Sequence, residues 1–273
     1  MVRDPHSLVD VPLRKNQRDP AEIMAAKSNA DLSPCVSVVV PVFNEESTVG
    51  NLLASVLSQR PVLELIVVDD ASNDKSWAVL TEMARKDSRV KLHRHAVNRG
   101  KGAALATALA HVSTPLVLIQ DADLEYDPAE YFLLLKPILS GKADVVYGSR
   151  FLGSGAHRVL YFWHYVGNNF LTLLSNMLTN INLTDMETGS KAFRTEILAN
   201  LCLEEPRFGF EPEFTAKISR LGLSIYEVPV SYYGRTYAEG KKIGWRDGLS
   251  ALRCIIQYNL FSRRPRPTDR PPA

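Results

Sequence analysis

The sequence lacks the features that assign a chain to a membrane or to an oxidising compartment. None of its 273 residues lies in an apolar run of the roughly 18 residues that a membrane span needs, and the first residues have no signal-peptide core. The cysteines, Cys35, Cys202 and Cys254, are few and far apart, which is typical of packing thiols rather than of disulfides. We therefore expect a cytoplasmic protein that is still able to work at a membrane surface.

The charge balance argues against another class of protein. Lysine and arginine total 32 against 30 aspartate and glutamate, so a net charge of +2 disfavours a nucleic-acid partner that depends on a strongly basic surface. The sequence also has no Walker loop, no G-x-G-x-x-G spacing and no visible internal repeat. What is present is an ordinary globular composition, 45% hydrophobic and 23% charged.

Both ends of the chain have a composition that buries little. Residues 1–34 are polar and carry prolines at positions 5, 12, 20 and 34, and residues 262–273 are rich in proline and arginine. We expect a flexible extension over 1–34, one folded domain over 35–261 and a flexible tail over 262–273.

Within the domain, apolar strands alternate with amphipathic helices. The stretch 44–59 has helical periodicity behind Asn44, a candidate helix cap. Strands rich in Val, Ile and Leu without polar alternation are typical of a parallel sheet covered on both faces. The sequence therefore predicts an α/β fold of the doubly wound, Rossmann-like type, with its first strands at 35–43, 63–70, 90–95 and 115–123.

A polar segment follows each of these four strands. The segments read FNEE, DDASND, NRGKG and DADLE in chain order. The carboxyl ends of parallel strands meet at one edge of the sheet, where α/β proteins bind their ligands. We expect the four segments to form one site.

The fourth segment carries the acids that suit a metal ion. If the chain stays extended, Asp121 and Asp123 point the same way while Ala122 turns towards the core. Two carboxylates on one side suit Mg2+ or Mn2+ that also holds phosphates. Glu125 joins them if the extension continues, and the alternative is a loop whose acids are only solvated.

The last acid of this segment has a different predicted role. Asp127 precedes Pro128, and Glu130 lies three residues after Asp127, as in a capping box. We expect Asp127 to begin a helix rather than to bind a ligand.

The second and third segments have features that suit a nucleotide or another anion. Asp69 and Asp70 are adjacent and face opposite ways, so at most one reaches a ligand, and a cap or turn role is an equal alternative. In NRGKGAA, Arg99 and Lys101 flank a glycine at the start of a helix, where free backbone N–H groups attract anions. An ordinary loop with surface cations is the alternative.

Basic residues recur in glycine-containing loops of the second half. Together with the metal pair, they indicate a second anionic group that the protein must bind. These residues are Arg150, Arg158, Arg235, Lys241 and Lys242.

Seven segments in this order resemble a known family. VVVPVFNEE, VVDDASND, NRGKGAA, DADLEYDP, GSRF, TGSKAFR and RTYAEGKK are similar to motifs of glycosyltransferase family 2, with the GT-A fold. Within that family they resemble the polyprenyl-phosphate hexose synthases, such as the dolichyl-phosphate mannose synthases and glucosyltransferases. The resemblance covers about residues 36–260 and makes 35–261 a catalytic domain.

The resemblance implies roles for individual residues. Asp121 and Asp123 hold the metal, together with Glu125 where mannose synthases often have glutamine, and Asp123 counts as catalytic. Arg150 and Arg158 meet the acceptor phosphate as further catalytic residues. Roles for Asp185, Glu187 and Lys191 carry over less directly, because TDMETGSKAFR departs from the mannose-synthase pattern. The donor-binding residues are expected to be Pro41, Phe43, Glu45, Asp70, Arg99, Lys101, Asp121, Ala122, Arg235 and Lys241.

The reaction implied is a single displacement with inversion. A hexose moves from a nucleotide sugar, with UDP-glucose favoured over GDP-mannose, to a polyprenyl or dolichyl phosphate whose oxygen is already ionised near neutral pH. A soluble or glycan hydroxyl acceptor would instead need a base, for which Glu187, Glu211 and Glu213 are candidates. Two further hypotheses are a nucleotide-sugar binding protein without turnover and a nucleotidyltransferase.

One stretch of the sequence is a candidate for contact with a membrane surface. Residues 160–181 are rich in leucine and have Tyr161, Phe162, Trp163 and Tyr165 close together, which suits a helix in the bilayer interface as well as one packed in a core. A homo-oligomer or a membrane-anchoring partner is compatible with either arrangement.

Overall fold

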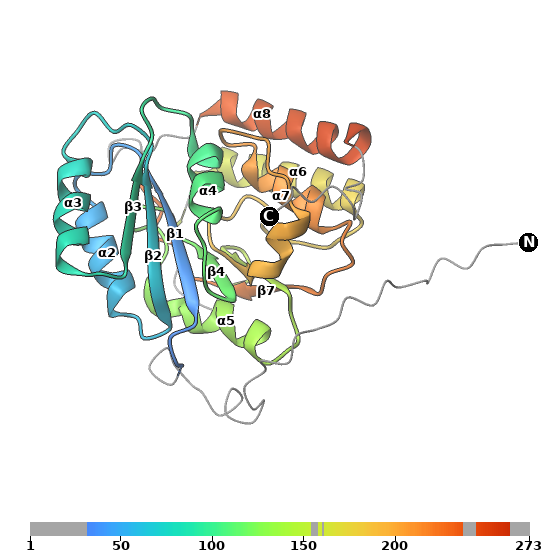
Figure 1. Cartoon of the computed structure of the whole chain (residues 1–273). Helices are drawn as coiled ribbons and strands as arrows, with labels where there is room; N and C mark the ends of the chain where they lie inside the picture. The colour runs from blue at the N-terminus through green and yellow to red at the C-terminus, as the bar shows by residue number, and fades with distance from the viewer. Residues whose placement is uncertain (1–31, 154–157, 160, 237–243, 263–273) are drawn as a thin grey trace, which may run out of the picture.

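A seven-stranded sheet runs through the described part of the chain, which in this computed structural model comprises residues 32–153, 158–159, 161–236 and 244–262 (Figure 1). The strand order is β3-β2-β1-β4-β6-β5-β7. All neighbouring strands pair in parallel except β6, which is antiparallel to both β4 and β5. The predicted α/β class with a mostly parallel sheet is confirmed. The strands are β1 Val36–Val42, β2 Val62–Asp69, β3 Val90–Arg94, β4 Leu116–Ile119, β5 Val145–Ser149, β6 Lys191–Arg194 and β7 Ile225–Pro229.

Helices cover both faces of this sheet. Val38 and Val40 of β1 pack in a core with α2, α3 and α5, whereas Val39 packs in a second core with α4, α6 and α7. Two covered faces explain why the strands show no polar alternation. The helices are α2 Val49–Ser58, α3 Ser76–Lys86, α4 Lys101–Leu109, α5 Tyr131–Leu139, α6 Phe162–Thr179, α7 Phe210–Ile218 and α8 Trp245–Ile256, with short helical turns at Pro128–Glu130, Thr195–Asn200 and Gln257–Phe261.

The first helix begins later than the periodicity predicts. Asn44, the predicted cap, has a φ of 52°, and α2 follows Thr48 instead. The Asn44 side chain accepts a hydrogen bond from the Asn73 N–H at 2.8 Å, and its own N–H donates to Ser72 Oγ at 3.0 Å. The prediction was wrong because Asn44 joins the loops that follow β1 and β2, and this needs a left-handed residue.

The predicted domain boundaries differ slightly from the extent of the core. Leu32, expected in the N-terminal extension, is buried against the first core. The rest of that extension, 1–31, and residues 263–273 of the predicted tail lie outside the described residues.

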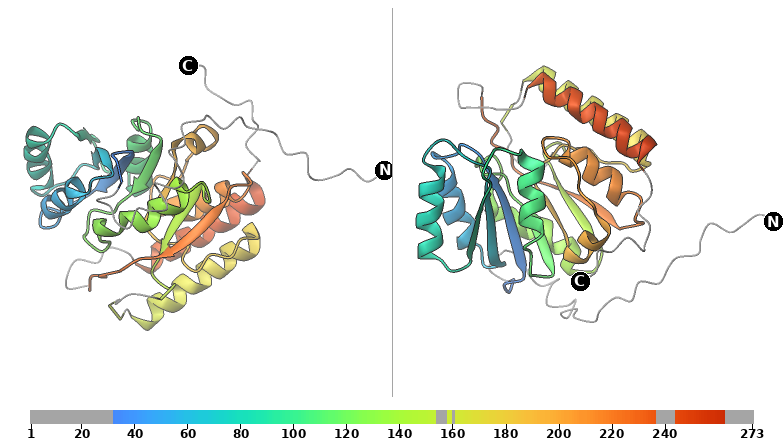
Figure 2. Two further views of the ribbon diagram at one scale, coloured as in Figure 1. Left: turned by 90° about the horizontal axis from the view of Figure 1, so that it is seen from below. Right: turned by 45° about the horizontal axis from the view of Figure 1, so that its top comes forward.

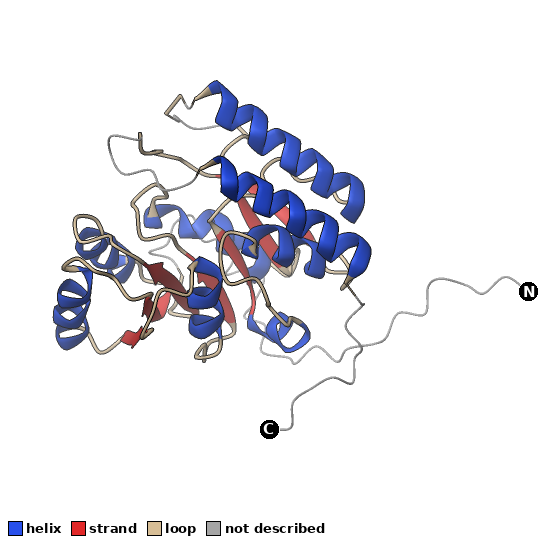
Figure 3. Ribbon diagram, turned by 90° about the horizontal axis from the view of Figure 1, so that it is seen from above, coloured by secondary structure: helices blue, strands red, loops and turns tan. Residues whose placement is uncertain are grey.

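Helices α6 and α8 lie side by side along one edge of the molecule (Figures 2 and 3). Phe162 and Trp163 at the start of α6 are 66% and 78% exposed, and Tyr161 and Tyr165 are exposed as well. Core packing, one of the two alternatives for residues 160–181, is therefore wrong for these aromatics, whereas Leu171, Leu174 and Leu178 further along α6 pack against the second core. Within the described residues, no helix combines the length and the apolar character needed to cross a membrane.

At the opposite edge from the strand carboxyl ends, one carboxylate connects three strands. Glu64 of β2 accepts hydrogen bonds from Ser37 of β1 and Lys91 of β3, and from the N–H and Oγ of Ser113, both at 2.8 Å. Burial alone would raise the pKa of Glu64, but these donors together lower it from 4.5 to about 2. The ionised carboxylate therefore stabilises the fold.

We expect Glu64→Gln to lower the free energy of unfolding by about 2 kcal/mol at pH 7, since the donors lose a charged acceptor. The folded pKa is below the unfolded value, so this contribution is present above pH 4.5 and disappears as the pH falls towards 2. Chemical denaturation at several pH values measures it. The control Glu82→Gln, at a solvent-exposed ion pair with Lys86, should leave stability unchanged, and a deficit in Glu64→Gln that does not shrink in acid would contradict the assignment.

Candidate active site

The acids predicted to hold a metal lie in a turn rather than in an extended segment. Strand β4 ends at Ile119, Ala122 and Asp123 lie in a turn, and Leu124 has a φ of 60°. The extended geometry predicted here was therefore wrong. Asp121 and Asp123 are nevertheless close enough to interact, and Ala122 is buried in the core as predicted.

Two cations from distant segments hold these two acids. Lys101 Nζ, at the start of α4, lies 2.8 Å from Asp121 Oδ1 and 2.9 Å from Glu211 Oε1. Arg235 Nη2 lies 3.3 Å from Asp123 Oδ2, and Arg235 Nη1 lies 3.1 Å from Glu45 Oε2. The structure thus brings together four of the predicted donor-binding residues and the predicted metal ligand Asp123, and adds Glu211.

Glu125 connects the metal turn to the segment after β7. Its Oε2 accepts a hydrogen bond from the Tyr232 hydroxyl at 2.6 Å, and its Oε1 accepts from the Arg235 N–H at 2.8 Å. The Glu125 carbonyl accepts from the Tyr233 N–H at 2.9 Å. Glu125 therefore positions this segment, and its role as a metal ligand stays a prediction.

The electrostatics of the turn suit a cation. Burial, followed by the nearby charges of Asp121 and Glu125, raises the pKa of Asp123 to about 7, against the opposing effect of Arg235. A divalent cation would relieve this repulsion, and hard carboxylate oxygens are the ligands that Mg2+ and Mn2+ prefer. Among the described residues, no group of three or more His, Cys, Asp and Glu side chains forms a ready metal site. The residues fit a cation held by the Asp pair together with phosphate oxygens.

The helix start predicted after this turn is present, but its capping differs. The Asp127 side chain accepts a hydrogen bond from the Ala129 N–H at 2.9 Å, and Pro128 begins the helical turn. Glu130 does not complete a capping box, because its carboxylate accepts from the Ser231 N–H and hydroxyl at 2.8 and 2.6 Å. Both Glu125 and Glu130 thus hold the segment that leads to Arg235.

The backbone donors of NRGKG bind an anion, but the anion belongs to the protein. Asp70, which is buried, accepts from the Arg99 and Gly100 N–H groups at 2.9 and 2.6 Å, and the His95 ring nitrogen Nδ1 lies at 2.6 Å from it. The Ala103 N–H donates to the carbonyl of Pro206 at 2.9 Å. The Arg99, Gly100 and Ala103 N–H groups are therefore engaged by the protein, and nucleotide contacts of Asp70 and Arg99 stay predictions.

The predicted acceptor side is built around Arg150. Its Nε and Nη2 each donate at 2.6 Å to one oxygen of Asp185, Nη2 also reaches Asn168 at 3.1 Å, and its guanidinium lies 5.1 Å from the centre of the Tyr232 ring. Nη1 has no protein acceptor within the described ranges. The Arg158 N–H donates to the Tyr232 carbonyl at 3.3 Å, and its Nη1 donates to the Gly234 carbonyl at 2.9 Å.

A cavity of about 320 Å³ opens beside this arginine pair. It combines two guanidinium groups with a mostly apolar and aromatic wall. The lining residues are Arg150, Phe151, Arg158, Val159, Phe162, Tyr165 and Tyr232.

The three glutamates considered as bases have different surroundings. Glu213 is buried and accepts from the Glu204 and Glu205 N–H groups and from Lys217, so it stabilises the fold. Glu211 is paired with Lys101. Glu187 Oε1 is buried and has no hydrogen-bond partner among the described residues.

The remaining predicted residues fall into two groups. Pro41 lies within β1 and Phe43 follows that strand, at the same edge of the sheet as the acids. Lys241 and Lys242 lie outside the described residues.

Two tyrosines of the site were not predicted from the sequence. Tyr232 lies between Arg150 and Glu125, and the buried Tyr126 hydroxyl accepts from the Gly189 N–H at 3.2 Å and lies 3.3 Å from the Thr188 hydroxyl. An aromatic ring inside an acidic loop, as in DADLEYDP, was the available signal for Tyr126.

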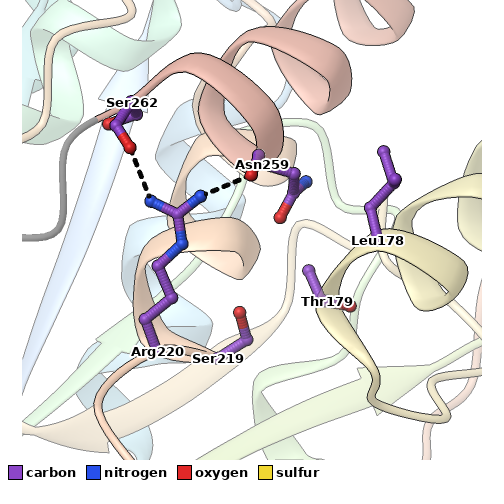
Figure 4. A pocket seen from close by; sticks show the side chains of 6 residues that line it. All are labelled: Leu178, Thr179, Ser219, Arg220, Asn259 and Ser262. Atoms are coloured by element: carbon purple, nitrogen blue, oxygen red, sulfur yellow. Dashed lines mark hydrogen bonds between the residues drawn. The ribbon is translucent and has the colours of Figure 1, made fainter.

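A second cavity, of about 340 Å³, lies between the ends of α6 and α7 and the C-terminal helical turn (Figure 4). Arg220 occupies its wall and donates to the carbonyls of Tyr258, Asn259 and Ser262. Because this arginine closes the end of a helix, the cavity reflects local packing rather than the site above.

The fold matches solved glycosyltransferases. Glucosyl-3-phosphoglycerate synthase from Mycobacterium tuberculosis, solved with Mn2+, UDP and phosphoglyceric acid, superposes with a TM-score of 0.65 at 23% identity, covering 92% of this chain and 86% of that one. The expected GT-A fold is therefore confirmed.

The sequence itself assigns the family. Residues 37–202, the greater part of the chain, match Glycosyl transferase family 2, so the chain belongs to this family, whose members take a sugar from a nucleotide sugar. A dolichyl-phosphate beta-glucosyltransferase from Trichomonas vaginalis is 30% identical, over 84% of this chain and 74% of that protein. An undecaprenyl-phosphate mannosyltransferase from Micrococcus luteus is 27% identical, over 84% and 95%. The resemblance drawn from the seven motifs is confirmed.

Gly189 tests the predicted metal turn, because a side chain there would overlap Asp121 Oδ2. We expect Gly189→Ala to displace Asp121 and to weaken Mn2+-dependent UDP binding by about tenfold or more, as measured by calorimetry. Gly248→Ala is the control, since a Cβ there meets nothing within 4 Å. Equal Mn2+ dependence in Gly189→Ala and the unmodified protein would show that Asp121 does not hold the ion.

Proposed function

We propose that the protein is an inverting, metal-dependent hexosyltransferase that moves a hexose from a nucleotide sugar to a polyprenyl or dolichyl phosphate. UDP-glucose is the favoured donor, with GDP-mannose as the alternative. The names of two relatives, a dolichyl-phosphate glucosyltransferase and an undecaprenyl-phosphate mannosyltransferase, support this acceptor class.

The single observation that carries the proposal is the cavity beside Arg150. A lipid phosphate has a doubly charged head and an apolar tail, and this cavity offers two arginines together with aromatic and aliphatic walls. The Nη1 of Arg150 faces no protein acceptor in the described residues, so it is suited to a phosphate oxygen. A neutral sugar acceptor would find few hydrogen-bond partners on such walls.

On the donor side, Asp121 and Asp123 would hold Mg2+ or Mn2+ against the diphosphate. Bound there, the ion would neutralise charge on the leaving nucleotide. Lys101 and Arg235 hold the carboxylates in place before the donor arrives. The solved glucosyl-3-phosphoglycerate synthase contains Mn2+ together with UDP-glucose, which supports a divalent ion in this fold.

The chemistry needs little from a general base. A phosphomonoester with a second pKa near about 6 is largely ionised at neutral pH and can attack the anomeric carbon directly. Accordingly, Glu211 is engaged by Lys101 and Glu213 by backbone N–H groups, so neither is poised to remove a proton. Arg150 and Arg158 would offset the repulsion between the acceptor phosphate and the donor diphosphate.

The exposed aromatics of α6 extend the acceptor cavity outwards. Phe162 and Tyr165 line the cavity and are also exposed at the surface, next to Trp163. Aromatic side chains at such a face suit the interface of a lipid bilayer. We propose that this end of α6 touches the membrane in which the acceptor resides.

The first test is transfer itself. Purified protein should move radiolabel from UDP-glucose or GDP-mannose into the lipid phase when supplied with Mn2+ or Mg2+ and a short polyprenyl phosphate, and a chelator should abolish this. Label in a water-soluble product only would favour a soluble acceptor, and no label from either donor would contradict the proposed reaction.

Arg158→Ala should raise the KM for the lipid phosphate about tenfold while leaving donor affinity unchanged, since a charged hydrogen bond to phosphate is lost.

The second test concerns the membrane. The double variant Phe162→Ser, Trp163→Ser should bind phospholipid vesicles about tenfold more weakly, because two exposed aromatic side chains no longer enter the interface. Its activity should fall with a long-chain acceptor in vesicles and persist with a short acceptor in solution. Unchanged vesicle binding in a sedimentation assay would mean that this face does not contact lipid. Leu63→Ser, an exposed apolar residue of β2, is the matched control.

A further inference from the structure

The loop that precedes β6 enters the site because that strand is antiparallel. Lys191, the first residue of β6, is paired with Ile119 at the end of β4 and with Tyr147 of β5. Residues 185–190 therefore continue past the carboxyl end of β4, with the Gly148 N–H of β5 donating to the Ser190 carbonyl at 2.9 Å, at the edge where donor and acceptor are expected to meet.

Contacts on opposite sides of the site fix the two ends of this loop. Asp185 is bound by Arg150 on the acceptor side, and its N–H donates to Glu227 at 3.1 Å. Gly189 packs so closely on Asp121, on the metal side, that a side chain would not fit. Glu187 is the midpoint between these two anchors, and it comes from a chain segment that cannot shift far.

The side chain of Glu187 lacks a hydrogen bond that a buried carboxyl oxygen normally accepts. Its Oε1 is buried without a hydrogen-bond partner among the described residues, whereas Thr188 beside it donates to the Gly148 carbonyl at 2.6 Å. An unsatisfied buried acceptor costs stability, and such groups in native proteins call for an explanation in function. Oε1 is thus placed to accept a hydrogen bond from a ligand.

The charges around Glu187 restrict the kind of ligand. Burial and the nearby Glu211 raise the pKa of Glu187 to about 8, although Lys191 and Arg150 act in the opposite direction. In its ionised form this carboxyl group repels phosphate, and in either form it offers an oxygen that can accept a hydrogen bond from a neutral hydroxyl. Of the groups in the proposed reaction, the hexose and the ribose carry neutral hydroxyls, and the hexose is the one expected between the donor diphosphate and the acceptor phosphate.

We propose that Glu187 binds a hydroxyl of the hexose carried by the donor and determines which hexose the enzyme accepts. This inference rests on the proposed function, which needs the hexose to lie between the diphosphate at Asp121 and the acceptor phosphate at Arg150. Glu187 lies on the loop that joins these two positions, and its unpaired oxygen supplies the acceptor that a sugar hydroxyl needs.

The test compares binding of nucleotides with and without the sugar. Calorimetry with Mn2+ would measure the affinities for UDP, UDP-glucose, GDP and GDP-mannose in the unmodified protein and in Glu187→Gln and Glu187→Met. Glutamine keeps an acceptor oxygen, whereas methionine has similar length and none. Glu196→Met, at an exposed residue outside the site, is the matched control.

Glu187→Met should lose about tenfold in affinity for the sugar nucleotide that the unmodified protein prefers, and less than about twofold for UDP or GDP, because one hydrogen bond to the sugar is removed. Glu187→Gln should retain part of that affinity. A series of donors that each lack one sugar hydroxyl identifies the hydroxyl that Glu187 binds. The unmodified protein should bind the donor without that hydroxyl about tenfold more weakly than the parent donor. Glu187→Met should bind these two donors equally well. The Tm of Glu187→Gln should not fall, since Oε1 has no protein partner to lose among the described residues.

Two results would overturn the inference. Equal losses for UDP and UDP-glucose, accompanied by a fall in Tm, would assign Glu187 a structural role. Affinities unchanged in Glu187→Met would remove it from the sugar site. The binding measurements contain no acceptor, so they test the role of Glu187 independently of lipid transfer. Failure of lipid transfer alone would contradict the proposed function but not the binding of the sugar by Glu187.

Discussion

Repulsion among the carboxylates behind β4 is the constraint on which the rest of the site depends. Asp121, Asp123 and Glu125 lie in one turn, and their proximity together with burial raises the pKa of Asp123. Lys101 and Arg235 compensate this charge from α4 and from the segment after β7. The position of these two segments is therefore set by charge as well as by apolar packing, which explains why acids and bases from remote parts of the chain meet at one point.

Different strands of the mixed sheet support the donor side and the acceptor side of the site. Parallel strands β3, β2, β1 and β4 present the loops expected to meet the donor, and β6, β5 and β7 support the arginines expected to meet the acceptor. The ion pair of Glu45 with Arg235 joins the two halves across 190 positions of sequence. The donor half and the acceptor half of the sheet are thus in direct contact, and a reaction between two bound anions requires this contact.

The fold and the chemistry of the strand ends could be predicted from the sequence, because apolar runs and polar strand ends are local patterns. The exact geometry could not. Asp121 and Asp123 were expected to align through an extended chain, but the segment turns at Ala122 and Asp123, and Leu124 after them is left-handed. NRGKG was expected to offer its N–H groups to an anionic ligand, yet those of Arg99 and Gly100 are bound by Asp70, 29 positions from Arg99. Such pairings depend on tertiary contacts that no local spacing encodes.

The internal anion has a consequence for binding energetics. Because Asp70 already fixes the N–H groups of Arg99 and Gly100, the loop before α4 is ordered before any ligand arrives. A ligand that settles against this loop does not have to supply the conformational entropy of ordering it, which for an unstructured segment costs on the order of 1 kcal/mol per residue. The interactions that stabilise the folded protein already offset the entropy lost on ordering this loop, so the contacts with the ligand contribute more fully to its affinity.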